Sequence, residues 1–222
     1  MAYYNTVLTL DTYIGTETQS GSNISWSSNS NIVSTPSSYA KVEKLGASVY
    51  DTGGDGNQIT YISEWITAKK SDMSSIPSKL RISQMRFIID YDITFKNFSL
   101  TQTYYGGDIS TSLGVSKNAT KPGGSGNTGT VLIGESQTGI VIYDTYNFTR
   151  TDQTSSWLAA SNTNIVTGDD LKDSNFRVFS KGLLYIYNQG TNFPDLTLKV
   201  SKLRLEIEGN LPSGLLQVTT FQ

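Results

Sequence analysis

The sequence predicts an all-β fold, an antiparallel β-sandwich of the jelly-roll type. Short stretches alternate apolar and polar residues, as a strand with one buried face requires. Turn-forming residues separate these stretches at intervals of roughly 8–14 residues, which is typical of sandwiches and jelly rolls. No stretch of useful length has helical periodicity. A chain of 222 residues fits one such domain.

The clearest strand is the last one, at residues 196–207. Its apolar side consists of Leu196, Leu198, Val200, Leu203, Leu205 and Ile207. The alternation slips by one residue between Val200 and Leu203, where Ser201 and Lys202 intervene. A one-residue slip would turn every later side chain to the wrong face, so we expect a β-bulge there. The preceding strand is expected at 176–187.

The remaining strands follow from the same alternation. We expect them at 4–14, 39–50, 59–68, 80–95, 131–133 and 139–148, with a return strand or hairpin at 97–105 and a single helical turn at 157–160. Residues 106–130 are rich in Gly and Ser and predict a long loop. The predicted organisation is an N-terminal strand or arm (1–25), a β-sandwich domain (26–208) and a C-terminal tail (209–222).

Composition excludes several function classes. The chain has no Cys and no His, so disulfides, thiol nucleophiles, His-based acid–base catalysis and the usual zinc sites are excluded. The net charge of −2 predicts no nucleic-acid partner. No apolar run approaches the ~20 residues that span a bilayer, and the N-terminus has no secretory signal, so no membrane partner is expected. No cofactor is expected either.

Two acidic groupings are candidate sites. Asp90 and Asp92 lie two apart on one strand, about 7 Å from each other, a separation that suits a glycosidase pair. One strand is a poor frame for carboxylates on opposite sides of a sugar ring, so we interpret them as a solvated strand face and predict no enzyme. The second grouping, Asp169, Asp170 and Asp173, is interpreted as capping a turn.

A glycine-rich turn is a candidate calcium site. Asp51, Asp55 and Asn57 offer oxygen ligands there. The spacing is not that of the twelve-residue calcium loop, and the closing Glu is missing. A plain turn explains these residues, and no metal site is predicted.

Aromatic residues make up 11% of the chain and raise the alternative of sugar stacking. Trp26, alone in a polar stretch, either plugs one end of the sandwich or stacks on a sugar. Tyr104 and Tyr105 are the other stacking candidates in the first half of the chain. Tyrosine also has high strand propensity, so a structural role remains open for both.

Three segments together resemble a known family. The first runs over 26–32 (WSSNSNI) and on to Ser38-Tyr39-Ala40, and the second is an Ile76-Pro77 turn leading into a strand. The third runs from Trp157 through 169–171 to 174–178 (SNFRV), before the closing strand. In this order they resemble a jelly-roll domain of tailed-bacteriophage structural proteins. The resemblance covers about 26–208 and departs at Arg177, where the family pattern has Gly.

The resemblance implies a virion component, such as a head decoration, collar or tail protein. Its partners would be other virion proteins and further copies of itself. We expect its apolar ends to make the contacts, through Val7, Leu8, Leu10, Tyr13, Leu215, Leu216, Val218 and Phe221. The alternative function is a carbohydrate-binding module that recognises a glycan on the host surface.

Overall fold

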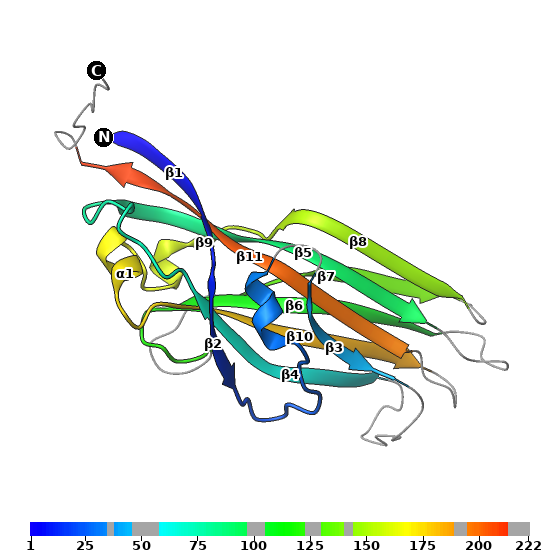
Figure 1. Ribbon diagram of the computed structural model, residues 1–222. Helices are drawn as coiled ribbons and strands as arrows, with labels where there is room; N and C mark the ends of the chain where they lie inside the picture. Colours follow the sequence, from blue (N-terminus) through cyan, green and yellow to red (C-terminus); the bar gives the residue numbers. More distant parts are fainter. Residues whose placement is uncertain are drawn as a thin grey trace.

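The chain folds as two antiparallel β-sheets packed face to face, as a computed structural model shows (Figure 1). The structure describes residues 1–34, 38–45, 58–96, 105–122, 130–139, 144–188 and 195–212. For 58, 59, 105, 106, 138, 139, 187 and 188 it describes the backbone alone. The predicted all-β sandwich is confirmed.

Six strands form the first sheet, called sheet A. Its order is β1 (Ala2–Thr9), β11 (Asp195–Leu211), β5 (Arg81–Lys96) and β8 (Thr145–Thr154). The short β3 (Ala40–Lys44) pairs with the first part of β11, and β9 (Leu158–Ala159) pairs with the first part of β5. β11 therefore has β5 along one edge and β3 followed by β1 along the other.

Five strands form sheet B. Its order is β2 (Thr12–Glu17), β4 (Gln58–Lys69), β10 (Arg177–Asn188), β6 (Tyr105–Ser116) and β7 (Thr130–Gly139). The helical elements are short: η1 (Asn29–Val33), η2 (Ala160–Asn162) and α1 (Gly168–Lys172). In the described parts of the chain, no helix is long and apolar enough to cross a membrane.

The strand pairing is that of a jelly roll. Apart from β1, β2 and the two-residue β9, eight strands remain, and they pair from the outside inwards: β3 with β11, β4 with β10, β5 with β8 and β6 with β7. This is a long hairpin rolled up so that its strand pairs alternate between two sheets, which gives the two Greek keys of the jelly roll. β1 and β2 then add one strand to an edge of each sheet.

The core lies between the sheets and follows the predicted alternation. Phe87, Ile89 and Ile93 of β5 are buried, as are the predicted apolar residues of β11. The predicted bulge is confirmed, because the register of β11 against β5 shifts between Ser201 and Arg204. Lys202 takes the extra position with φ of 53°.

The expected loop at 106–130 is wrong over its first half, because β6 runs to Ser116 and lies inside sheet B. Gly is a weak strand signal, but Ile109, Leu113 and Val115 alternate along this segment and are fully buried. Small residues fit this interior strand, and Thr111 forms a buried hydroxyl–hydroxyl hydrogen bond of 2.8 Å with Ser180 of β10. The Gly-rich residues 123–129 lie outside the described residues.

Three further elements differ from expectation. The expected first strand, 4–14, is two strands, because the chain crosses from sheet A to sheet B at Leu10 and Asp11. β8 continues beyond 148, where the expected strand ends, and its residues up to Thr154 pair with β5. The helical turn expected at 157–160 is the short strand β9 followed by η2.

Candidate functional site

The outer edge of β1 is an unpaired sheet edge in the described part of the chain. β1 pairs with β11 along one side, and no described strand pairs with its other side. Its eight residues, AYYNTVLT, include no charged residue and no proline. Natural edge strands are usually protected from further pairing by charges, proline or bulges. β1 has neither charge nor proline, and its register with β11 is regular.

The other edge strands differ from β1 in this respect. β2 ends in Glu17 and has an irregular register at Tyr13 and Gly15. The remaining edge strands longer than two residues carry charged side chains: Lys41, Glu43 and Lys44 in β3, Glu135 in β7, Arg150 and Asp152 in β8. Among the described edge strands longer than two residues, only β1 offers an uncharged edge with a regular register.

Side chains on the outer face of β1 add apolar surface beside that edge. Tyr3 is 67% exposed and Val7 is 45% exposed, while Leu8 on the opposite face is buried. Tyr4, also on the inner face, packs against the core. The strand is therefore held firmly from one side and open along its other edge.

Polar contacts also anchor β1 to β11. The Tyr3 hydroxyl donates to Glu208 Oε1 at 2.8 Å, and the Asn5 amide donates to Glu206 Oε1 at 3.0 Å. The hydrogen bond to Glu208 raises the pKa of Tyr3. Hydrogen bonds from Gln84 and Tyr3 lower the pKa of Glu208. These bonds fix the position of β1, so the open edge is preformed.

The contact residues predicted from the sequence divide between core and surface. Leu8 and Leu10 are buried in the core of their own chain, and Tyr13 packs against it. Leu8 and Leu10 are therefore not free to contact another subunit, Tyr13 is partly buried, and Val7 is exposed. Val7 differs from Leu8 because neighbouring residues of a strand face opposite sides of the sheet. The other four, Leu215, Leu216, Val218 and Phe221, lie outside the described residues.

Of the three predicted stacking residues, only Trp26 has a described side chain. Trp26 is 6% exposed, and its indole N–H donates to the Glu64 carbonyl at 2.8 Å, so it plugs the sandwich. Tyr104 lies outside the described residues, and for Tyr105 the structure describes the backbone alone.

Asp90 and Asp92 lie on the outer face of β5, and both are engaged by cations. Asp90 is 1% exposed, and its Oδ1 accepts hydrogen bonds from Arg204 at 3.1 Å and from the Asp152 backbone N–H at 2.8 Å. Asp92 pairs with Lys199 at 3.0 Å. Neither carboxylate lines either of the two cavities described below, and both belong to a structural ion-pair network.

The calcium candidate and the acidic cluster at 169–173 remain. Asp51, Asp55 and Asn57 lie outside the described residues. Within the described ranges, no group of three or more acidic side chains is placed to hold a metal ion. The capping prediction is confirmed, because Thr167 and Asp170 form a capping box at the start of α1. Asp173 accepts a hydrogen bond from the Asn175 backbone N–H at 2.8 Å.

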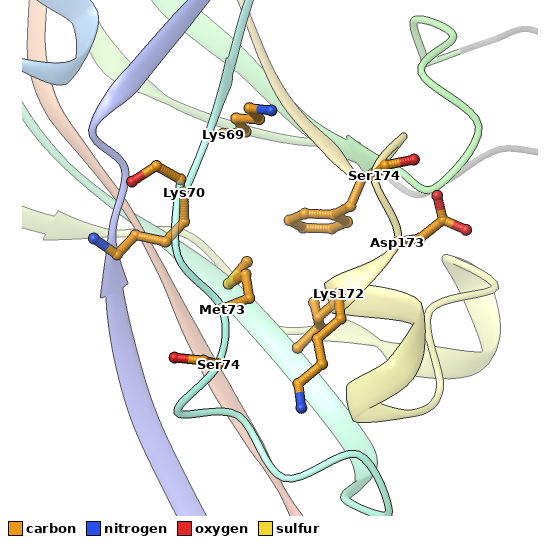
Figure 2. Close-up of a pocket in the computed structure, with 10 residues that line it drawn as sticks. Lys69, Lys70, Met73, Ser74, Lys172, Asp173 and Ser174 are labelled. Carbon is orange, nitrogen blue, oxygen red and sulfur yellow. The ribbon is translucent and has the colours of Figure 1, made fainter.

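A pocket of about 300 Å³ lies where the end of β4 faces α1 and the start of β10. Figure 2 shows Met73 between Lys70 and Lys172 in this pocket. Lys70 is paired with Asp11 at 2.5 Å, and Lys172 donates to the Ser78 hydroxyl at 3.1 Å. Three lysines, Lys69, Lys70 and Lys172, line the pocket. Two of their ammonium groups are thus already engaged, so the pocket is a weak candidate for an anion-binding site.

A second cavity of about 490 Å³ opens on the outer side of sheet B. Trp65 lies in its wall, 2% exposed, with the Lys181 ammonium 4.7 Å from its ring centre. Phe179 contacts the same ring edge-to-face. Burial lowers the pKa of Lys181. The sequence reasoning missed this cluster, although Trp65 and Lys181 are direct partners in the register of β4 and β10.

No protein-family model matches the chain, and no match was found among curated proteins.

Proposed function

We propose that this protein is a structural subunit of a bacteriophage virion that binds neighbouring subunits through the outer edge of β1. The observation that carries the proposal is the uncharged, regular and exposed edge of Ala2–Thr9. Such an edge offers backbone N–H and C=O groups to an added strand, and Tyr3 and Val7 add side-chain contacts beside it.

The fold is compatible with this proposal but does not select it. Double-sheet jelly rolls occur in viral capsid proteins, in lectins and in cupins. A fold can host unrelated functions, so the site has to decide between them. The edge of β1 favours assembly, because a long unprotected edge strand otherwise invites aggregation. The virion setting itself comes from the sequence resemblance.

The proposal is tested by the oligomeric state of the full chain. We expect the wild type to form a defined oligomer by size-exclusion chromatography with light scattering. Val7→Lys places a charge beside the open edge and should shift the chain toward monomer. Leu132→Lys is the matched control, because Leu132 is 60% exposed on β7, at the edge of the other sheet. The control should retain the oligomer.

Point substitutions are a cleaner test than deletion of the N-terminus, because such a deletion would remove Leu8 and Leu10 from the core. A monomeric wild type, or equal behaviour of the two Lys variants, would contradict assembly through β1. The virion setting has a separate test, which is mass spectrometry of purified phage particles from a host that carries the sequence. Absence of the chain from those particles would contradict it.

A further inference from the structure

A continuous polar surface crosses three strands on the outer face of sheet A. Here β1, β11 and β5 lie side by side, with Asn5 opposite Glu208 and Glu208 opposite Gln84. One step further along the strands, Glu206 lies opposite Arg86. With strands about 4.8 Å apart, the surface is about 10 Å wide.

Hydrogen bonds join these side chains into one network. The Gln84 amide donates to Glu208 Oε2 at 2.6 Å, and Arg86 Nε donates to Glu206 Oε2 at 2.6 Å. Asn5 bridges the two carboxylates, donating to Glu206 at 3.0 Å and to Glu208 at 3.3 Å. The side chains are thereby held in place on the sheet.

An aromatic ring borders the surface on each side. On the β5 side, the Arg86 guanidinium lies 4.4 Å from the ring centre of Trp157, which keeps part of its surface in solvent. On the β1 side, Tyr3 is 67% exposed and hydrogen-bonded to Glu208. The network therefore runs without a break from Trp157 to Tyr3.

Several polar groups of this network remain available. Asn5 and Gln84 use their amide N–H groups, and no described residue donates to their side-chain carbonyl oxygens. Arg86 uses Nε for Glu206, and its two terminal nitrogens have no hydrogen-bond partner in the described structure. Preplaced donors and acceptors next to partly exposed rings match the hydroxyl groups and apolar faces of a sugar.

We propose that this surface, formed by Tyr3, Asn5, Gln84, Arg86, Trp157 and the carboxylates of Glu206 and Glu208, binds a neutral saccharide. One guanidinium against two carboxylates makes the surface net negative, which disfavours anionic sugars. Tyr3 and the solvent-exposed part of Trp157 would supply the stacking surface, and the free amide oxygens and guanidinium nitrogens would bind hydroxyls. The proposal does not depend on assembly through β1.

Tryptophan fluorescence offers a site-specific test, because Trp157 is the one partly exposed residue among the three tryptophans. Trp26 and Trp65 are 6% and 2% exposed. The probes are neutral oligosaccharides of glucose, galactose, mannose and N-acetylglucosamine, with sialyllactose as the anionic comparison. We expect at least one neutral probe to change the emission saturably and to protect it from acrylamide quenching, and sialyllactose to bind more weakly.

Variants are then compared by saturation-transfer NMR and calorimetry, which need no tryptophan. Trp157→Ala should weaken binding roughly tenfold or more, the loss of one aromatic stacking contact. Gln84→Ala should weaken it roughly 2- to 12-fold, the loss of one hydrogen bond. Tyr185→Ala is the matched control, since Tyr185 is a partly exposed aromatic on the outer face of sheet B, and it should bind as the wild type does.

Three results would overturn the proposal. The first is that no neutral probe binds the wild type at millimolar concentration. The second is that Trp157→Ala binds as tightly as Tyr185→Ala while circular dichroism shows both to be folded. The third is that sialyllactose binds as tightly as the best neutral probe. In each case the network would serve only to fasten β1, β11 and β5 together.

Discussion

At the residue scale, Asp90 is the most consequential polar side chain of the fold. It lies beside the bulge of β11, where the backbone leaves Lys202 at positive φ, and beside a register shift of β8 next to Asp152, also at positive φ. Its carboxylate binds Arg204 and the Asp152 backbone N–H, and Lys202 Nζ lies 3.8 Å from Oδ2. One buried charge thus holds two irregular strands in register.

The first prediction concerns the partner of that charge. Arg204→Met should destabilise the protein by roughly 3–5 kcal/mol, because it leaves a buried carboxylate without its closest cation. The measurement is urea unfolding followed by circular dichroism. Lys199→Met is the matched control, since it removes a similar ion pair to Asp92 with a 36% exposed lysine. The control should cost no more than about 1 kcal/mol.

Equal losses in the two variants would show that the Asp90 network is worth no more than a surface ion pair. The sequence alone could not reveal this network. Alternation correctly placed Asp90 on the outer face of its strand, but a solvated position was expected. Its burial comes from the bulge and from β8, which are 50 or more residues away in the chain.

At the element scale, α1 shows how a five-residue helix is held in place. Thr167 accepts from the Asp170 backbone N–H, and Asp170 accepts in return from the Thr167 backbone N–H, a capping box. Asp170 also pairs with Lys117 at 3.1 Å. Burial alone would raise the pKa of Asp170, but hydrogen bonds from the Val166 backbone N–H, Lys117 and Thr167 lower it below its usual 3.8.

The second prediction follows from that lowered pKa. Asp170→Ala should cost about 1 kcal/mol at pH 7, typical of a lost cap. A lowered folded-state pKa gives stability that is fully present above the unfolded value of 3.8 and is lost as pH falls through the folded value. The difference from wild type should therefore shrink below pH 3.8, as measured by thermal unfolding across pH.

Asp169→Ala provides the control for this prediction. It removes the same charge one residue earlier in α1, from an exposed side chain with no hydrogen bond in the described structure. Its stability should stay close to that of the wild type at all pH values. A pH-independent loss in Asp170→Ala would contradict the role of its ionised form.

The sequence predicts a strand well where apolar and polar residues alternate strongly. The strands β5, β10 and β11 bury long regular rows and were expected within a few residues of their bounds. β6 was missed because Gly106, Gly107 and Gly114 read as loop, although Gly107 sits where a side chain would collide with the Tyr185 carbonyl at 2.8 Å. The glycine there allows β6 to lie close to β10, which only the three-dimensional structure shows.

At the scale of the whole molecule, the jelly roll was predictable but its edges were not. Strand spacing indicates the class of fold, since each strand needs one buried face. Which strand ends a sheet depends on pairings such as Ala2 with Leu211, which join the two ends of the described chain. The open edge of β1 and the polar surface beside it therefore emerge only from the assembled sheets.

The last prediction asks whether the N-terminal segment belongs to the fold. Leu10 is 1% exposed, and its backbone N–H donates to the Leu203 carbonyl of β11 at 3.1 Å, where the chain crosses between the sheets. Leu10→Ala should therefore cost roughly 2–5 kcal/mol in urea unfolding, as for other buried leucines. Val7→Ala, at a 45% exposed position of β1, should change stability by less than about 0.5 kcal/mol. Because Val7 and Leu10 lie only three residues apart, a free arm would make both changes equally small, whereas a strand shared between core and edge makes only one of them large.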